Sequence, residues 1–307
     1  MSKGLYPIRT ISAMTGVNPV TLRAWERRYG LIRPQRTPKG HRLYTERDID
    51  RIQQILVLLE RGIPISQAQQ VLDDDDVVLE EPQAGSESED TLSTWDEQRH
   101  RWRGALANLD EHALDAAYSE TLALFPADLV HGRLLRPLLA DLAAEIGDDS
   151  TARARHRFLT AFLKNKLSAR FHHQAGRATG PKLIAATAPG ECDDLALMLA
   201  ACGAQSGGYR VVLLGASVDA ETLAAAGGLS RSAAVLLSAH APSAPPGLLD
   251  ALRGLEYPVF MLDGAAHWVT NEGDGGNLIP ARDATRLLQL VGRHVPPATV
   301  GRQRSVG

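Results

Sequence analysis

The most concentrated chemistry in this chain is positive charge near the N-terminus. Residues 1–72 hold twelve Lys or Arg against five Asp or Glu, although the formal net charge of the whole chain is −3. Residues 33–42 contain no acid and carry the basic side chains Arg33, Arg36, Lys39, His41 and Arg42. Charge that is merely solvated is rarely gathered in this way, whereas a phosphate-binding surface requires it. The pattern therefore predicts a nucleic-acid-binding module.

A short helix should position part of this charge. Asn18 is a good N-cap, Pro19 suits the first helical position, and Gly30 should end the helix. Its apolar residues can face inward, which leaves other faces for Arg23, Arg27 and Arg28. Prolines and a glycine interrupt the basic stretch that follows, as in a turn-containing ribbon. A short helix followed by a basic ribbon favours a helix in the major groove of DNA and a wing on the flanking DNA backbone.

The run from Ile11 to Tyr44, followed by 48–52, resembles the MerR family of winged-helix transcription regulators. Ala24-Trp25 stands where many members have two tyrosines, and we expect Trp25 to be a core or interface anchor. The resemblance implies that the chain binds double-stranded DNA at an inverted repeat, as a dimer or higher oligomer, with RNA polymerase as a further partner. The side chains expected on the major groove are Thr21, Arg23, Arg27 and Arg28. Those expected on the wing are Arg36, Lys39, His41, Arg42 and Tyr44.

The rest of the chain predicts a multidomain α and α/β protein. Four helical segments, at roughly 95–107, 110–124, 127–146 and 151–173, predict a four-helix bundle. Four apolar strands, at 182–187, 209–214, 233–238 and 258–262, alternate with helices and predict a doubly wound parallel sheet. The expected parts are a winged helix-turn-helix domain (1–75), an acidic flexible linker (76–94), the bundle (95–177), a Rossmann-like domain of cobalamin-binding type (180–297) and a tail (298–307).

The layout is similar to the branch of CarH/LitR-like and MlrA-like regulators, which carry a cobalamin-binding-type sensor at the C-terminus. In members that bind cobalamin, an acid-x-His-x-x-Gly motif follows the first strand, and its His ligates cobalt. Here Glu191 is retained, but Asp193 stands in place of that His and Ala196 in place of the glycine. Carboxylate oxygen is a poor substitute for imidazole at cobalt. A light-sensing member would also have a Trp where Glu145 stands.

The sequence therefore predicts a degenerate sensor that reads another ligand or mediates oligomerisation, with no cofactor and no metal. Its candidate pocket residues are His156, Glu191, Asp193, Ser238, His240 and Gly264. Cobalamin can be held without a lower protein ligand, so a cobalamin-dependent, light-responsive repressor stays an alternative. A corrinoid carrier or enzyme is the alternative from another class. It is weakened by the missing imidazole and by the basic N-terminal region, which an enzyme does not require.

Composition excludes several other classes. No apolar run approaches the length of a membrane span, and residues 1–7 lack the apolar stretch of a signal peptide. Two cysteines, Cys192 and Cys202, are too few for a disulfide scaffold. No Ser-His-Asp order or dinucleotide fingerprint is present. We therefore expect a cytoplasmic protein that is not an enzyme.

Overall fold

The computed structural model describes residues 4–73, 94–176, 178–269, 276–281 and 284–296. It divides into two compact units, Met1–Leu159 and Thr160–Gly307. The division falls inside the long helix α9 (Ser150–Ala175). Most of the predicted acidic linker and the whole of the predicted C-terminal tail lie outside the described residues. The predicted domain boundaries therefore stay predictions.

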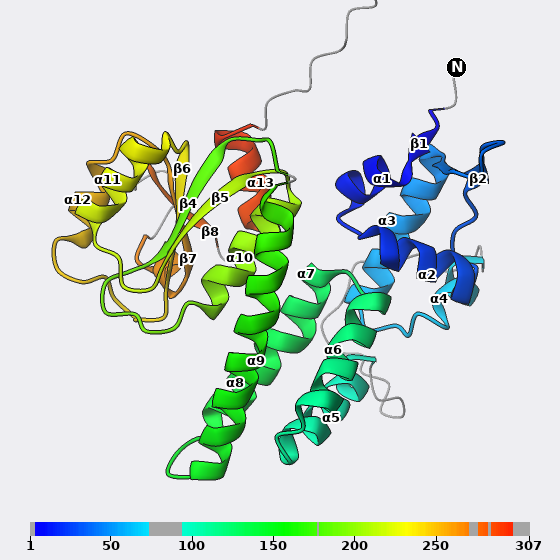
Figure 1. The fold of residues 1–307 in the computed structure, drawn as a ribbon, viewed down its shortest axis with the longest axis horizontal. Helices are drawn as coiled ribbons and strands as arrows, with labels where there is room; N and C mark the ends of the chain where they lie inside the picture. Colours follow the sequence, from blue (N-terminus) through cyan, green and yellow to red (C-terminus); the bar gives the residue numbers. More distant parts are fainter. Residues whose placement is uncertain (1–3, 74–93, 177, 270–275, 282–283, 297–307) are drawn as a thin grey trace, which may run out of the picture. The chain divides into compact units, whose positions relative to one another are not determined.

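The first unit begins with a helix-turn-helix (Figure 1). Its helices are α1 (Ile8–Thr15), α2 (Pro19–Tyr29), α3 (Glu46–Glu60) and α4 (Ala68–Asp73). The Asn18 side-chain oxygen accepts hydrogen bonds from the backbone N–H groups of Val20 and Thr21, at 2.8 and 2.9 Å. Gly30 ends α2 with a φ of 63°, a left-handed conformation that suits glycine. Both predicted ends of this helix are confirmed.

The predicted basic ribbon is a small antiparallel sheet. Its strands are β1 (Tyr6–Pro7), β2 (Gln35–Arg36) and β3 (Arg42–Tyr44), in the order β1-β3-β2. The turn between β2 and β3 is closed by a 2.8 Å hydrogen bond from the Gly40 N–H to the Thr37 carbonyl. Thr45 then starts α3 through a capping box with Asp48, as its position predicts. The hairpin between β2 and β3 is called the wing below.

A helical segment completes the first unit. It consists of α5 (Thr94–Ala107), α6 (Glu111–Leu124), α7 (Ala127–Leu129), the π-helical turn η1 (Val130–Leu135) and α8 (Arg136–Ala144). The helix predicted over 127–146 is thus interrupted. Pro137 has no N–H to donate to the carbonyl of Arg133, and a wide π-helical turn accommodates the missing bond. Trp102 joins α5 to α6 by donating to the Thr121 hydroxyl at 3.3 Å.

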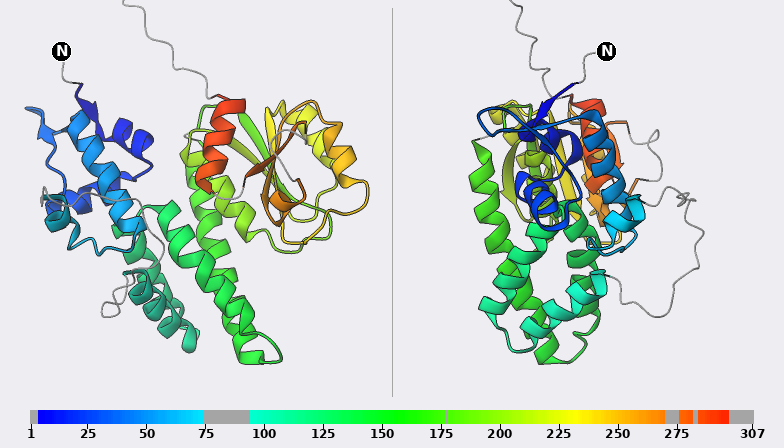
Figure 2. Two further views of the ribbon diagram at one scale, coloured as in Figure 1. Left: turned by 180° about the vertical axis from the view of Figure 1, so that it is seen from behind. Right: turned by 90° about the vertical axis from the view of Figure 1, so that its right-hand side faces the viewer.

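The second unit contains a five-stranded parallel sheet with helices on both faces (Figures 1 and 2). The strands are β4 (Lys182–Thr187), β5 (Arg210–Gly215), β6 (Ala234–Ala239), β7 (Val259–Asp263) and β8 (Leu278–Ala281). The helices are α10 (Leu195–Ser206), α11 (Ala220–Ser230), α12 (Leu248–Arg253), η2 (Gly264–His267) and α13 (Ala284–His294). Buried residues of α10 and α13 pack on one face, and those of α11 and α12 on the other.

The strand order β5-β4-β6-β7-β8 is that of a doubly wound sheet. The order reverses between β4 and β6, so a crevice for ligands is expected beyond the carboxyl ends of these two strands. The prediction of four strands is wrong by one, because β8 was missed. The strand contains Pro280, which an edge strand tolerates because its backbone need not donate to a further neighbour.

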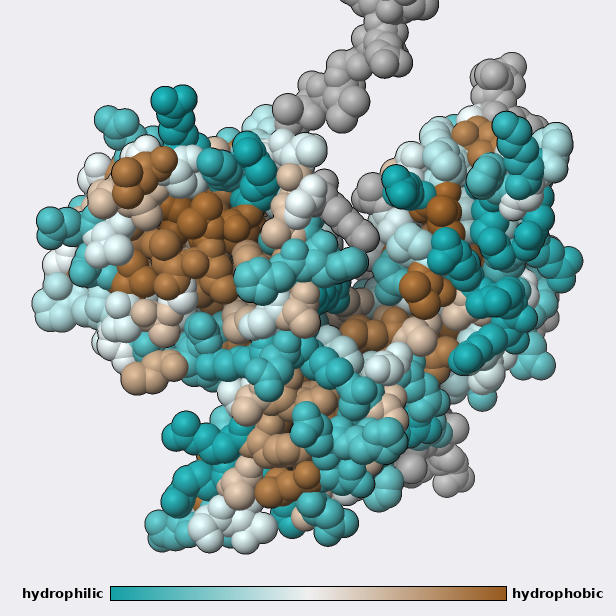
Figure 3. Space-filling view, viewed as in Figure 1, coloured by the Kyte–Doolittle hydropathy of each residue, from teal (hydrophilic) through white to brown (hydrophobic). Residues whose placement is uncertain are grey.

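The second unit exposes apolar side chains on its surface. Four residues of the edge strand β5 are partly exposed, Val211, Val212, Leu213 and Leu214, and Figure 3 shows an apolar area over this unit. No helix in the described part of the chain is both long enough and apolar enough to cross a bilayer.

Candidate nucleic-acid interface and sheet-edge site

Three arginines of α2 are exposed to solvent. Arg23, Arg27 and Arg28 project from the helix whose N-terminus Asn18 caps. Among the residues that the structure describes, no carboxylate forms an ion pair with any of the three. Their guanidinium groups are therefore available to an external anion such as phosphate.

The wing adds further cations beside α2. The side chains of Arg36, Lys39 and His41 are exposed, and that of Arg42 is half-buried. Glu26 of α2 binds two of them, since it accepts a hydrogen bond from Arg36 at 2.9 Å and another from Arg42. Burial opposes ionisation of Glu26, but the bonds from Arg42 and Arg36 outweigh it and lower the pKa of this carboxyl. Glu26 therefore fixes the wing against the helix.

Two of the side chains predicted to contact DNA are buried. Thr21 is 0% exposed and donates to the Leu122 carbonyl of α6 at 3.3 Å. Tyr44 is also 0% exposed, and its hydroxyl makes no hydrogen bond with any described residue. Burial raises the pKa of Tyr44 to about 12. Neither side chain can touch DNA in this conformation, so the two contacts stay predictions that require rearrangement.

Trp25 confirms its expected role as an anchor. Its side chain is 0% exposed, and the indole N–H donates to the Leu124 carbonyl of α6 at 2.9 Å. Trp95 of α5 makes a matching contact in the opposite direction, because its indole N–H donates to the Leu59 carbonyl of α3 at 3.0 Å. The helix-turn-helix thus donates one indole hydrogen bond to the helical segment and accepts another from it. We call this pair of contacts the tryptophan clasp.

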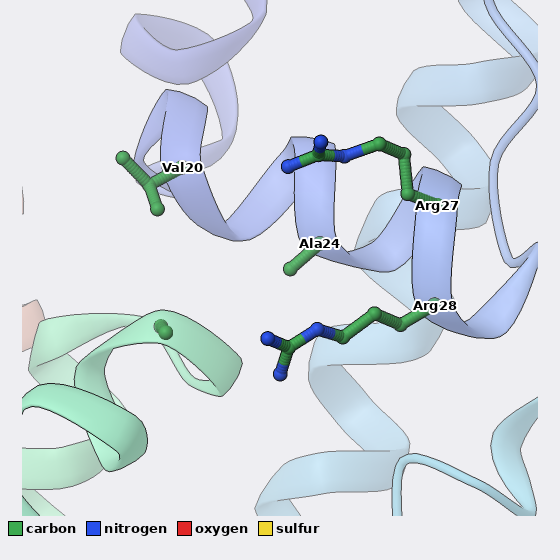
Figure 4. A pocket seen from close by; sticks show the side chains of 5 residues that line it. Val20, Ala24, Arg27 and Arg28 are labelled. Carbon is green, nitrogen blue, oxygen red and sulfur yellow. The ribbon is translucent and has the colours of Figure 1, made fainter.

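A groove of about 360 Å³ lies between α2 and α6 (Figure 4). Its lining residues are Val20, Ala24, Arg27, Arg28 and Ala123. Arg28 extends from α2 toward α6, whereas Arg27 lies along α2. The groove thus brings two guanidinium groups of the candidate DNA-binding helix beside the C-terminal end of α6.

In the second unit, Glu191 joins the loops that follow β4 and β6 at the strand reversal. This carboxylate follows β4 and accepts hydrogen bonds from the backbone N–H groups of His240 and Ala241, which follow β6, at 2.8 and 2.9 Å. The His240 ring nitrogen Nδ1 lies 3.3 Å from the second carboxylate oxygen. Burial opposes ionisation of Glu191, but these bonds lower its pKa. Two of the predicted pocket residues, Glu191 and His240, are therefore brought together as partners.

Asp193 is held by a lysine of α9. The ammonium group of Lys164 lies 3.0 Å from Asp193 and 2.8 Å from Asp194. Asp193 also accepts a hydrogen bond from the Leu195 N–H at 3.1 Å. Burial opposes ionisation of Asp193, but the bonds from Lys164 and Leu195 outweigh it and lower the pKa of the carboxyl. The residue in the expected ligand position is therefore engaged inside the protein.

The remaining pocket residues fit the backbone closely. The Ser238 hydroxyl, at the end of β6, donates to Asp263 at 2.8 Å. Asp263 has a φ of 53°, which is uncommon for a residue with a side chain. A Cβ on Gly264 would lie 2.7 Å from the Ala239 carbonyl oxygen, so only glycine fits there. His156 is partly buried on α9 in the first unit.

Several contributors to these sites have no signal in the sequence. Glu26, Lys164 and Asp263 were missed, because their partners are decided by the approach of distant elements. Within the described stretches, no group of three or more His, Cys, Asp or Glu could hold a metal ion.

Comparison with known proteins adds an independent line of argument. Residues 6–75 match the model of the MerR HTH family regulatory proteins. The chain is 30% identical over 230 residues to the HTH-type transcriptional repressor CarH of Myxococcus xanthus, covering 73% of this chain and 75% of the relative. It is 27% identical to the repressor CarA of the same organism, over 83% of this chain and 85% of that one.

A further relative matches only part of this chain. The HTH-type transcriptional regulator MlrA of Escherichia coli K12 is 34% identical over 44% of this chain and half of its own length. Among solved structures, a monomethylamine corrinoid protein of Methanosarcina barkeri has 18% identity and a TM-score of 0.48, covering 64% of this chain and 97% of that one. That likeness is too distant to support an argument about function.

Proposed function

Because the chain belongs to the MerR HTH family of regulatory proteins, we propose that it binds DNA through α2 and the wing. Membership makes the chain a DNA-binding transcription regulator. The observation that carries the assignment of the surface is the set of three exposed arginines on α2, which no carboxylate pairs with in the part of the chain that the structure describes. Arg23, Arg27 and Arg28 address the major groove and its phosphates.

The wing holds the DNA backbone in this proposal. Lys39 and His41 lie in the turn of the hairpin and contact phosphate as exposed groups. Arg36 and Arg42 each form an ion pair with Glu26. To contact DNA, each arginine must either exchange this carboxylate for a phosphate or bind both. Tyr44 supports the wing from the core.

The test is the salt dependence of DNA binding. Each phosphate that a cation neutralises adds about 0.9 to the slope of log K against log salt concentration. The full-length protein is titrated with a labelled duplex, and the same titration is repeated with Arg23→Ala and with Lys39→Ala. We expect weaker binding to every sequence and a slope lower by about one for each variant. An unchanged slope in both variants would show that α2 and the wing are not part of the DNA interface.

We also propose that the protein binds an inverted-repeat operator as a dimer or higher oligomer, with RNA polymerase as a further partner. A two-fold operator requires two copies of α2, and this unit holds one. Gel filtration of the protein with and without operator DNA tests this directly. A monomer under both conditions would contradict it.

For the second unit, we propose a sensor domain that does not ligate a corrinoid through a protein imidazole. The residues at the strand reversal fit that group poorly. Asp193 is a hard oxygen donor that is already paired with Lys164, and the imidazole at this edge, His240, is engaged by Glu191. In this proposal the second unit instead binds another ligand or mediates oligomer contacts.

Titration with adenosyl-, methyl- and hydroxocobalamin, followed by visible spectra in the dark and in light, tests this proposal. We expect no binding at tens of micromolar. Binding with a light-dependent change in oligomeric state would favour a cobalamin-dependent repressor instead. Binding without a change in the spectrum would show that cobalamin is held without a protein ligand to cobalt.

A further inference from the structure

The tryptophan clasp holds α2 against the C-terminal end of α6. The last carbonyl groups of a helix have no partner within it and need donors from elsewhere. In α6 the Leu122 carbonyl accepts from Thr21 and the Leu124 carbonyl from Trp25. The helix proposed to bind DNA therefore supplies the missing donors of a helix outside its own domain.

This contact lies on a flank of α2 that DNA needs. The residues of α2 that line the groove, Val20, Ala24 and Arg27, follow helical spacing and share one side of the helix. Ala123 of α6 lines the same groove. The major groove is about 12 Å wide, which is close to the diameter of one helix with its side chains. A second helix against this side occupies the place of one sugar-phosphate strand.

Charge favours the same closed arrangement. The C-terminus of a helix carries roughly half a negative charge. This end of α6 lines the same groove as Arg27 and Arg28, and the Arg28 side chain extends toward it (Figure 4). The end of α6 therefore attracts the same guanidinium groups that phosphate would bind. Helix α6 competes with DNA for them.

We propose that the contact between α2 and α6 is autoinhibitory, and that the tryptophan clasp keeps the regulator in a state that binds DNA weakly. Opening the clasp frees the flank of α2 and Thr21, and it ends the competition of α6 for Arg27 and Arg28. Apparent DNA affinity then equals the intrinsic affinity multiplied by the open fraction. Any ligand or oligomer contact that moves α6 changes this fraction. The inference rests on the proposed role of α2 in DNA binding and adds its regulation.

The test weakens the clasp with neutral substitutions on either side. Trp25→Phe removes the indole N–H from α2, and Trp95→Phe removes the reciprocal donor from α5, outside the helix-turn-helix. Both full-length variants are titrated with a labelled duplex of mixed sequence, about three helical turns long. Loss of one hydrogen bond should raise the affinity about threefold to tenfold. Trp102→Phe is the matched control, because its indole bonds within the helical segment, to Thr121.

The outcomes separate this inference from the proposed function. Tighter binding by Trp25→Phe or Trp95→Phe, with Trp102→Phe unchanged, supports autoinhibition, since damage to the fold cannot strengthen binding. Equal or weaker binding by both variants overturns it, even if one of them folds poorly. If the wild-type protein and Arg23→Ala bind the duplex with the same salt slope, the proposed function itself fails.

A second experiment locks the clasp instead of opening it. Glu60 of α3 and Arg133 of η1 form an exposed ion pair at 3.8 Å that joins the same two parts of the first unit. Both are replaced by Cys in a Cys192→Ser background and joined by a short thiol crosslinker. Crosslinked protein should lose at least threefold in affinity relative to the uncrosslinked sample. Equal affinity of the two samples would overturn the proposal.

Discussion

The surface of α2 and the carboxyl edge of the parallel sheet handle charge in opposite ways. On α2 three arginines are exposed and have no carboxylate partner among the described residues. At the sheet edge the charged groups are paired within the protein, Glu191 with the backbone of the β6 loop and Asp193 with Lys164. The first region therefore presents its charge to solvent. The second uses charge to hold its own loops together.

This difference separates the proposed recognition surface from a sheet edge whose charged groups are already bonded within the protein. An exposed, unpaired cation adds little to folding and is free to bind phosphate. A carboxylate that accepts two backbone hydrogen bonds stabilises the loop that it joins and is costly to displace. The edge of the sheet can receive a ligand only if that ligand replaces these internal bonds.

The largest effect should follow from removing cations of α2. We expect Arg23→Ala/Arg27→Ala to weaken DNA binding by roughly tenfold to a hundredfold and to lower the salt slope by about two. Fluorescence anisotropy over a range of salt concentrations measures both quantities. Arg101→Ala is the matched control, because that guanidinium is exposed but paired with Glu120. Equal losses in both proteins would mean that only net charge matters.

The next effect concerns the bridge across the sheet edge. Glu191→Gln should lower the free energy of unfolding by about 2 kcal/mol, because two hydrogen bonds to a charged group are weakened. The pKa of Glu191 is lowered on folding, so its contribution is fully present above the ordinary value of 4.5 and is lost as the pH falls through the folded value.

Urea denaturation at a series of pH values measures this loss. The difference between wild type and Glu191→Gln should be largest near neutral pH and should shrink as the pH falls below 4.5. Glu256→Gln, at an exposed position, is the control and should have little effect at any pH. A difference that does not change with pH would show that the Glu191 charge plays no part.

A smaller effect is expected at Glu26, a paired carboxylate that lies among the arginines of α2 and the wing. Glu26→Gln weakens the bonds to Arg36 and Arg42 and should cost about 1 to 2 kcal/mol of stability. It also frees two guanidinium groups, so the salt slope of DNA binding should become steeper by up to about one. Thermal unfolding and anisotropy titration of the same sample check both signs. A shallower slope would mean that Glu26 positions these arginines for DNA.

The smallest effect should come from Tyr44→Phe. The Tyr44 hydroxyl is buried without a hydrogen-bond partner in the described structure, so its removal should stabilise the fold by up to about 1 kcal/mol. DNA affinity should not change, because the side chain is not exposed. Denaturation and binding titrations decide whether Tyr44 supports the wing or contacts DNA. Weaker DNA binding by a stable variant would restore the predicted contact.

Local features were predictable because their causes are local. The cap at Asn18, the terminator at Gly30 and the capping box of Thr45 depend on bonds between residues a few positions apart. The parallel sheet followed in the same way from short apolar runs that alternate with helices. The substitution of Asp193 for the expected imidazole was likewise visible in the sequence alone.

Only the tertiary structure decided which partners these residues meet. Trp25 was expected to be an anchor, but its acceptor is the Leu124 carbonyl, 99 positions along the chain. Glu191 meets its backbone donors 49 and 50 positions away. Such contacts depend on how complete helices and strands pack, and no local pattern of residue types records that packing. The sequence thus determined which groups the protein carries, and packing decided which remain free to bind.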